Sequence, residues 1–354
     1  MTQTLRHIAL ADGDAHDTLL PLTFTRPVSE LRIGILTMAE RRAAIEPAVY
    51  SPLTVDYLTE KWPADPEATE TADAAEIAGT DDGTGRPIRI TRPHDIFTHC
   101  GAALDVDFPL VTHGRESQPL SPTNTVIGPP ERIFIEAGAR VEGAILSTTG
   151  GPIYIGANAQ IGEGSCLRGP ISVGAKTIVN MGTRIYGPTA IGPQCRIGGE
   201  LNNVVIQGYT NKAHDGFLGN AVLGEWCNLG AGCNASNLKN DYTEVKQWSY
   251  PQRRFAKTGL LHCGLVMGDH SKAGINTMLN TATVTGVGVN IHGTGFPRNF
   301  VASFSEGSAS GFETVPFRKF IDTARRVMAR RDVELTEADE RMLTTVYALT
   351  ETYR

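Results

Sequence analysis

A six-residue repeat organises the chain from about residue 133 onward. An aliphatic residue recurs at every sixth position from Ile155 to Ile197, and a small residue stands four positions after most of them. The same pattern returns from Leu223 and from Met267. A period of six fits neither a helix, which repeats every ~3.6 residues, nor a simple alternating strand. It predicts a prism of stacked triangular coils, in which three six-residue sides make one coil of eighteen.

The composition agrees with such a prism. Each aliphatic residue would fill the interior, and Gly or Asn would form corners, where positive φ angles are cheap for these residues. Only seven of the 38 glycines lie in residues 1–126, which places a boundary near residue 127. Aromatic residues make up 7% of the chain, as expected for a core of thin aliphatic layers. We therefore expect three parts, at residues 1–126, 127–310 and 311–354.

Charge and composition exclude several classes of partner. A formal net charge of −6 gives no electrostatic footprint for nucleic acid or an anionic membrane. Neither an N-terminal signal pattern nor a run of eighteen apolar residues occurs, so we expect a cytoplasmic protein without a membrane partner. We expect no metal, because His262, His270 and His292 lack the close pairing of a zinc site. The cysteines form no CxxC pair, and three are expected to be small corner fillers: Cys195, Cys227 and Cys233.

Two polar stretches break the repeat. Residues 203–220 separate Ile197 from Leu223, and residues 235–264 separate Leu229 from Met267. Both are rich in aromatic, basic and polar residues that the repeat itself lacks. Because insertions into a solenoid become loops on one face, we expect both stretches to be loops that carry the chemistry.

The first of these stretches carries a specific motif. The segment KAHDGFLG, at residues 212–219, is followed by GEWCNLGAG and by SNLKN. Over about residues 127–300 this pattern resembles the acetyltransferase half of the bifunctional N-acetylglucosamine-1-phosphate uridylyltransferase and glucosamine-1-phosphate acetyltransferase family. The resemblance implies a left-handed parallel β-helix, whereas the general crossover rule would favour the right hand. It also implies acetyl-CoA as co-substrate and a homotrimer with active sites between neighbouring prisms.

The motif assigns catalytic roles to two residues. N-acetylation removes a proton from an amine as it attacks a thioester, and an imidazole with a pKa of about 6.5 suits that task at neutral pH. His214 is the predicted general base, and the alternative is a structural loop histidine. Asn228 matches the family position that aligns amine and thioester, and its amide could donate to the developing oxyanion. The alternative for Asn228 is an asparagine that forms a coil corner.

Further residues match family positions for substrate and cofactor. Lys212 and Arg184 could clamp a sugar phosphate, or could be solvated charges on turns. Asn237 stands at a second sugar-contacting position, and Phe217 replaces a family tyrosine, which removes a hydroxyl from the substrate site. The family's lysine pair is missing around Asn202. The family topology places coenzyme A along a later coil, at Gly274, Asn276 and Thr277, with Lys272 near its phosphates.

The N-terminal residues predict an α/β domain. The strings LRHIALAD and PIRITRP are expected strands, and a helical segment runs from Ser29 to about Ile45. The string LLPLTFTRPVSELRIGILTMAERR resembles the divergent sugar nucleotidyltransferase-like domain found fused to such β-helices. A Gly-rich phosphate loop is absent, and the acidic residues 63–85 are expected to be a flexible loop, so the domain is shortened and degenerate. Nucleotide binding would depend on Asp12, Arg26 and Arg32, and Mg²⁺ would be needed only by an active domain.

The end of the chain changes to a helical pattern. Apolar residues from Phe317 to Met328 share one helix face, and Thr336 with Asp339 resembles a capping box. We expect these helices to cover the open end of the β-helix, because an uncapped solenoid exposes strand edges. The arginines of this region are expected to form the solvated face.

Three hypotheses for function follow. The first is an acetyl-CoA-dependent N-acetyltransferase acting on an amino-sugar 1-phosphate or a sugar nucleotide, with His214 as base. The second is nucleotidyl transfer from UTP or dTTP to a sugar 1-phosphate by the N-terminal domain, alone or alongside acetylation. The third is a noncatalytic sugar-nucleotide-binding module on a degenerate scaffold.

Overall fold

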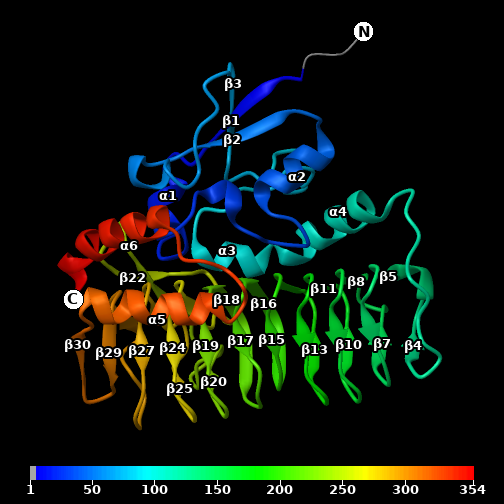
Figure 1. The fold of residues 1–354 in the computed structure, drawn as a ribbon. Helices are drawn as coiled ribbons and strands as arrows, with labels where there is room; N and C mark the ends of the chain where they lie inside the picture. Colours follow the sequence, from blue (N-terminus) through cyan, green and yellow to red (C-terminus); the bar gives the residue numbers. More distant parts are fainter. Residues whose placement is uncertain (1–4) are drawn as a thin grey trace.

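The computed structural model describes residues 5–354, and it has three parts (Figure 1). A long β-helix runs across the molecule, a small α/β unit lies along one side of it, and two C-terminal helices pack next to that unit. The β-helix is parallel and left-handed. The predicted fold class is therefore confirmed.

Three columns of short parallel strands form the sides of the prism. The first column contains β4 (Thr125–Ile127), β7 (Ile145–Ser147), β10 (Cys166–Arg168), β13 (Arg184–Tyr186), the start of β16 (Glu200–Gly208) and of β18 (Phe217–Glu225), β20 (Asn234–Ala235) and β25 (Met278–Leu279). The second contains β5 (Ile133–Ile135), β8 (Ile153–Ile155), β11 (Ile171–Val173), β14 (Thr189–Ile191), the ends of β16 and β18, β23 (Val266–Met267), β26 (Val284–Thr285) and β28 (Phe300–Val301). The third contains β6 (Arg140–Val141), β9 (Gln160–Ile161), β12 (Ile178–Val179), β15 (Arg196–Ile197), β17 (Asn211–Lys212), β19 (Asn228–Leu229), β24 (Lys272–Ala273), β27 (Asn290–Ile291) and β29 (Ser305–Ser308).

The six-residue repeat corresponds to the stacking of these strands. Leu167 pairs with Ile185, and Val179 pairs with Ile197, so a regular coil contains eighteen residues. The aliphatic residues of the repeat fill one continuous interior cluster. The three cysteines predicted as fillers lie in the same cluster, fully enclosed by neighbouring coils: Cys195, Cys227 and Cys233.

Residues 203–220 are not a loop, and the prediction from the sequence is wrong here. The strands β16 and β18 have nine residues each, pair in parallel and continue from the first column into the second. Ile197 pairs with Lys212 and Leu201 pairs with Leu218, so these coils contain fifteen and seventeen residues. The hexad register disappears from the sequence because the coils are shorter, while the strands still stack. The second stretch does leave the prism, as a hairpin of β21 (Lys246–Ser249) and β22 (Arg254–Lys257).

The N-terminal unit is built on a three-stranded parallel sheet with the order β2-β1-β3. Its strands are β1 (His7–Ala11), β2 (Val49–Leu53) and β3 (Glu70–Asp73), and its helices are α1 (Ala15–Thr18), α2 (Met38–Ile45), α3 (Pro93–Thr98) and α4 (Cys100–Thr112). Short 3-10 turns complete the described secondary structure of the chain, at Leu22–Phe24, Val28–Glu30, Asp56–Leu58, Pro130–Arg132 and Glu351–Tyr353.

Three predictions for this unit are wrong. Residues 63–85 include β3 and contribute buried Ala75 and Ile77 to the core, so the stretch as a whole is not a loop, although its residues 81–85 are exposed and without regular structure. The string PIRITRP forms only a single β-bridge, through Arg89, before Pro93 begins α3. The helix α2 begins at Met38 instead of Ser29, because Thr37 and Glu40 form a capping box there.

The N-terminal unit and the prism share one hydrophobic core. Ala190, Val205 and Val222 point out of the second column of strands and belong to the same buried cluster as Leu104 of α4. The run Val204–Ile206 is buried throughout because its strand is covered on both faces. Within the unit, Arg41 of α2 and Asp107 of α4 form a fully buried ion pair at 2.7 Å.

One edge of the prism, which we call the covered edge, runs beneath this unit and the C-terminal helices. Its corner residues share a positive φ of 52–60°, and along the chain they change from exposed polar to buried aromatic residues: Asn158, Lys176, Gln194, Tyr209, Trp226, His270 and Phe304. Tyr209 and Trp226 stack with ring centroids 4.2 Å apart. Bulky residues are rare at positive φ, so the packing of these rings holds them there.

The C-terminal helices are α5 (Phe317–Ala329) and α6 (Glu337–Leu349). The predicted apolar face of α5 is buried, and Thr336 and Asp339 form the predicted capping box. The helices do not cover the open end, however, because α5 runs back along the prism (Figure 1). Phe320 packs on His270 and Phe304 of the covered edge. The last coil is instead followed by β30 (Gly311–Thr314), which pairs antiparallel with β29.

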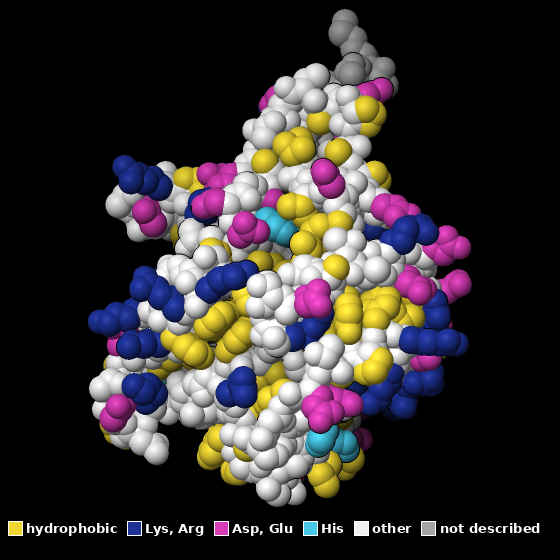
Figure 2. Space-filling model, turned by 90° about the vertical axis from the view of Figure 1, so that its left-hand side faces the viewer, with side chains coloured by type: hydrophobic (Ala, Val, Ile, Leu, Met, Phe, Trp, Pro, Cys, Tyr) yellow, Lys and Arg dark blue, Asp and Glu magenta, His cyan; other side chains and the backbone are white. Residues whose placement is uncertain are grey.

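The end of the molecule where the chain finishes has a mixed surface. Figure 2 shows Lys and Arg side chains gathered along both margins of this end, with hydrophobic side chains between them. No helix in residues 5–354 is long and apolar enough to cross a membrane.

Candidate functional site

A cavity of about 430 Å³, which we call the His214 cleft, lies between the prism and the turn that follows α5. The strands β15, β17 and β19 of the third column and the turns that follow β17 and β19 supply most of its wall. The cleft brings together the two residues predicted to be catalytic, His214 and Asn228, from successive coils. The residues that line it are Arg196, Asn211, Ala213, His214, Asn228, Leu229, Gly230, Ala231, Ile275, Arg330 and Arg331.

The backbone beneath His214 is tightly held. The Lys212 side chain is buried, and its ammonium donates hydrogen bonds to the carbonyl oxygens of Gly198, at 2.9 Å, and of His214. A Cβ atom at Gly198 would lie 2.2 Å from the Ala213 oxygen, so only glycine permits this close approach. The His214 side chain is exposed and lines the cleft. The coil therefore fixes the backbone of His214 and leaves its imidazole ring accessible.

Lys212 is enclosed more completely than the sequence suggested. Burial lowers the pKa of its ammonium to about 8, against weaker opposing effects of Cys233 and Asp215. Its described partners are two backbone carbonyl oxygens. The phosphate clamp predicted for Lys212 stays a prediction, and the contacts seen here position His214.

Asn228 is oriented by a relay of polar side chains. The Asn211 side-chain nitrogen donates to Asn228 Oδ1 at 3.3 Å, and Asn211 Oδ1 accepts from the Arg331 guanidinium at 2.8 Å. The relay occupies the side-chain oxygen of Asn228. Among residues 5–354 no hydrogen bond uses the Asn228 NH₂ group, which leaves this donor for a ligand in the cleft.

His214 stands on a second edge of the prism, which we call the open edge. Strand pairing aligns Met181, His214, Ala231 and Ile275 at equivalent corners of this edge. Met181 and Ile275 are 74% and 71% exposed, which is unusual for apolar side chains of this size. The described residues do not cover this edge as they cover the edge that carries Trp226.

The stretch predicted to bind coenzyme A lies in the coil after Asn228. Asn228 pairs with Lys272, and the backbone of Gly274 runs against Gly230 of the cleft wall. Lys272 donates to the His270 carbonyl oxygen at 2.8 Å, and burial lowers the pKa of its ammonium. Thr277 is buried and donates to the Gly274 carbonyl oxygen, whereas Asn276 is exposed.

Like Lys212, the other three residues predicted to bind substrate do not line the cleft. Arg184 pairs with Glu200 at 3.3 Å on the first column of strands. The Phe217 ring lies over Gly219, close to the Asn237 amide. Asn237 in turn donates to Asn220 Oδ1 at 2.7 Å. Their substrate roles stay predictions, at a distance from His214 along the coil.

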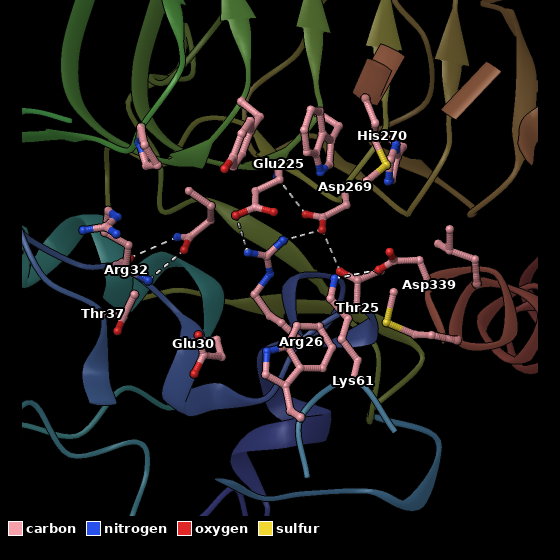
Figure 3. A pocket seen from close by; sticks show the side chains of 18 of the residues that line it. Thr25, Arg26, Glu30, Arg32, Thr37, Lys61, Glu225, Asp269, His270 and Asp339 are labelled. Atoms are coloured by element: carbon pink, nitrogen blue, oxygen red, sulfur yellow. Dashed lines mark hydrogen bonds and ion pairs between the residues drawn. The ribbon is translucent and has the colours of Figure 1, made fainter. Parts of the chain in front are cut away.

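Two residues predicted to bind nucleotide, Arg26 and Arg32, line a separate cavity of about 270 Å³ at the covered edge (Figure 3). Arg26 points between Glu225, at 3.1 Å, and Asp269, so its charge is matched by two carboxylates of the prism. Burial alone would lower the pKa of Arg26, but Asp269 and Glu225 raise it. The backbone of Arg32 exchanges two hydrogen bonds with the Gln207 side chain. These contacts join the N-terminal unit to the prism.

The third residue, Asp12, lies inside the N-terminal unit. It accepts a hydrogen bond from the Val28 backbone at 2.9 Å and another from Thr54. Burial raises its pKa to about 6, and these two hydrogen bonds oppose the rise. Asp12 therefore fixes the segment that carries Arg26, and it does not line the cavity of Arg26 and Arg32.

Sequence reasoning missed the arginines of the His214 cleft. Arg196 occupies an ordinary outward position of the repeat, and Arg330 and Arg331 follow a helix that was expected at the far end of the prism. No signal in the sequence relates the end of α5 to β15. Within residues 5–354 no group of His, Cys, Asp or Glu side chains is arranged to hold a metal ion.

Comparison with known proteins gives a family likeness for the N-terminal unit. Residues 8–80 match the sugar nucleotidyl transferase family, over about a fifth of the chain. No curated protein matches the sequence.

Solved structures give distant likenesses. The UDP-N-acetylglucosamine acyltransferase of Francisella novicida is 12% identical, with 65% of this chain and 78% of that chain covered and a TM-score of 0.32. The N-acyltransferase AntD of Bacillus cereus, solved with dTDP and 3-hydroxybutyryl-CoA, is 11% identical over 59% and 91%, with a TM-score of 0.23. The acetyltransferase domain of PglB from Neisseria gonorrhoeae, solved with acetyl coenzyme A, is 11% identical over 88% and 100%, with a TM-score of 0.19. Because these scores are low, the functional argument rests on the geometry of the cleft.

Proposed function

We propose that the protein is an acyltransferase that moves an acetyl group from acetyl-CoA to the amine of an amino-sugar 1-phosphate or sugar nucleotide. The observation that carries this proposal is the His214 cleft, where an accessible imidazole and the NH₂ group of Asn228 line one cavity. The cavity has the size of a small-molecule site, and its volume of about 430 Å³ accommodates a sugar. The interior of the prism is filled by aliphatic side chains, so a substrate would have to bind at the surface, as it would in this cleft.

His214 would act as general base. As the amine nitrogen attacks the thioester carbonyl, a ring nitrogen of His214 takes the amine proton. The NH₂ group of Asn228 would donate to the oxyanion that forms on the carbonyl oxygen. When the tetrahedral intermediate collapses, the carbon–sulfur bond breaks, and the proton on His214 passes to the leaving thiolate. The products are the amide and free coenzyme A.

We also propose a homotrimer in which a neighbouring prism closes the cleft along the open edge. The exposure of Met181 and Ile275, at 74% and 71%, supports this arrangement because both flank His214 along that edge. Light scattering after size exclusion would test it. We expect Ile275→Glu to dissociate the assembly, and a monomeric wild-type protein with full activity would contradict the trimer.

A second candidate function is sugar-nucleotide binding by the N-terminal unit. The family match over residues 8–80 favours it. Nucleotidyl transfer itself has less support, because the Gly-rich phosphate loop is absent and Arg26 is engaged by two carboxylates. Pyrophosphate release from UTP or dTTP with a sugar 1-phosphate would support nucleotidyl transfer. If no thiol were released from acetyl-CoA in the same preparation, nucleotidyl transfer would replace acyl transfer as the function.

The test of the main proposal is thiol release from acetyl-CoA with glucosamine 1-phosphate as acceptor. We expect His214→Gln to lower kcat at least 100-fold, the lower range for loss of a general base. A matched control is His292→Gln, which changes an exposed histidine outside the cleft. Thiol release that is equal in wild type and His214→Gln would exclude His214 as the base.

A further inference from the structure

We propose that Arg196, Arg330 and Arg331 form a phosphate-binding site in the His214 cleft, with two of its three cations supplied by the turn that follows α5. All three side chains line the cleft together with His214 and Asn228. The identity of the molecule that carries the phosphate rests on the proposed function, whereas the binding of phosphate itself depends only on the geometry of the site.

Two of the three guanidiniums converge on one backbone atom. Arg331 Nε donates to the Gln194 carbonyl oxygen at 3.3 Å, and Arg196 Nη1 donates to the same oxygen at 3.4 Å. Arg331 Nη2 donates to Asn211 Oδ1 at 2.8 Å. Because a guanidinium has five N–H donors in a planar fork, both groups keep donors for a ligand. The described contacts therefore fix the two side chains without using all their donors.

The cleft gathers positive charge without neutralising it. Among the described residues that line it, none is Asp or Glu. Burial and the neighbouring charges of Arg196 and Arg330 lower the pKa of Arg331. Arg26 gives the contrast, because its cavity holds two carboxylates at its guanidinium. Three close cations without a counter-charge repel one another, and a bound anion removes that repulsion.

Phosphate is the anion that fits these donors. Guanidinium groups bind phosphate oxygens in pairs of parallel hydrogen bonds, which a single ammonium cannot do. The site also lies beside His214, as an amino-sugar acceptor requires when its phosphate stands on the carbon next to the one that carries the amine. The other possible source is the diphosphate of coenzyme A, which the pantetheine arm separates from the thioester.

Calorimetric titration of the full-length protein with inorganic pyrophosphate, glucosamine 1-phosphate and coenzyme A tests the site. The variant is Arg330→Gln with Arg331→Gln, and the matched control is Arg318→Gln with Arg326→Gln, which removes the same charge from exposed positions of α5 outside the cleft. We expect the variant to weaken pyrophosphate binding at least 10-fold and the control to change it less than 2-fold. A loss confined to glucosamine 1-phosphate assigns the phosphate to the acceptor, and a loss confined to coenzyme A assigns it to the donor.

Unchanged affinities for all three probes, in a variant with wild-type circular dichroism, would overturn the site. Because Arg331 also contacts Gln194 and Asn211, the exposed Arg330→Gln single variant is measured as well, and we expect about a 3-fold loss. The outcome is separable from the proposed function. Pyrophosphate binding that depends on these arginines, in a protein that releases no thiol, would retain the site and reject the acyl transfer.

Discussion

The covered edge and the open edge of the prism are built from one repeat but carry different corner residues. At the covered edge, Tyr209, Trp226 and Phe304 take up positive φ and pack beneath other elements. At the open edge, His214 and Ile275 reach solvent from equivalent corners. Both edges come from the same repeat, but the backbone and the side chains differ at their corners: the covered-edge residues have positive φ and pack against the rest of the chain, whereas Met181, His214 and Ile275 lack positive φ and remain exposed. Stability is therefore expected to depend on the covered edge and catalysis on the open edge.

The largest effect is expected at the ion pair that joins the N-terminal unit to the covered edge. Asp269 accepts hydrogen bonds from Arg26, from Thr25 at 2.8 Å and from the Glu225 backbone at 2.8 Å. Asp269→Ala would leave the buried Arg26 with one carboxylate, and the loss of one partner of a buried pair costs about 3–5 kcal/mol. Urea unfolding followed by circular dichroism measures the change.

The control is Glu200→Gln, which removes the partner of the half-exposed Arg184 on the first column of strands. An exposed ion pair contributes about 1 kcal/mol or less. Equal losses for Asp269→Ala and Glu200→Gln would contradict the view that the covered edge holds the two units together.

A matched pair of truncations compares the edges directly. Trp226 is 6% exposed and stacks on Tyr209, so Trp226→Ala is expected to lower the free energy of unfolding by about 3–5 kcal/mol. Ile275 is 71% exposed, and Ile275→Ala is expected to change the free energy of unfolding of the monomer by about 0.5 kcal/mol or less. Thermal and urea unfolding, at a protein concentration below assembly, give both values. A large loss for Ile275→Ala alone would reverse the comparison.

The two edges also differ in how their histidines respond to acid. Burial lowers the pKa of His270 to about 3, and the charge of Lys272 adds to this effect, whereas Glu225 opposes it. In the unfolded chain His270 binds a proton below about pH 6.5. The unfolded state then holds more protons, so the free energy of unfolding falls as pH is lowered, by about 2 kcal/mol between pH 6.5 and pH 5.

The variant His270→Asn isolates this contribution, because asparagine tolerates positive φ and does not titrate. We expect the difference in unfolding free energy between wild type and variant to shrink or invert as pH falls from 6.5 to 5. His214→Asn, at the exposed corner, serves as the comparison variant. A constant difference for His270→Asn over this range would show that His270 is not held neutral.

Several parts of the fold were predictable because they are periodic. The hexads alone predict the prism, its interior residues and the exclusion of aromatics from that interior. The prediction is wrong at residues 203–220 because coils of fifteen and seventeen residues stack as well as coils of eighteen. In a shortened coil the six-residue period is lost from the sequence, but the backbone hydrogen bonds to the neighbouring coils are kept. The aromatic residues there, such as Tyr209, indicate packing against another element and not a loop.

The docking of non-adjacent elements was less predictable. The apolar face of α5 indicates that the helix is buried on one side, but the sequence of that face does not indicate which surface it packs against. Because α5 lies along the covered edge, Arg331 reaches Asn211, and the cleft therefore includes residues that are far from His214 in the sequence. Of the candidate site, His214 and Asn228 came from a motif within one region, whereas the arginines depend on the tertiary arrangement.

The smallest expected effect tests whether the turn after α5 orients the amide of Asn228, for which we propose a catalytic role. Asn211 connects Arg331 to Asn228 through two hydrogen bonds, at 2.8 and 3.3 Å. Asn211→Ala would free the Asn228 side chain to rotate, so we expect kcat for acyl transfer to fall about 10-fold, the equivalent of about 1.4 kcal/mol of transition-state stabilisation, with KM nearly unchanged. Asn211→Asp keeps the acceptor for Arg331 and removes the donor to Asn228, so it should lower kcat as much. A purely structural role for Asn211 would lower stability in both variants and leave kcat of the folded protein at the wild-type value. In that case the residues of the open edge would catalyse the reaction without help from the turn that follows α5.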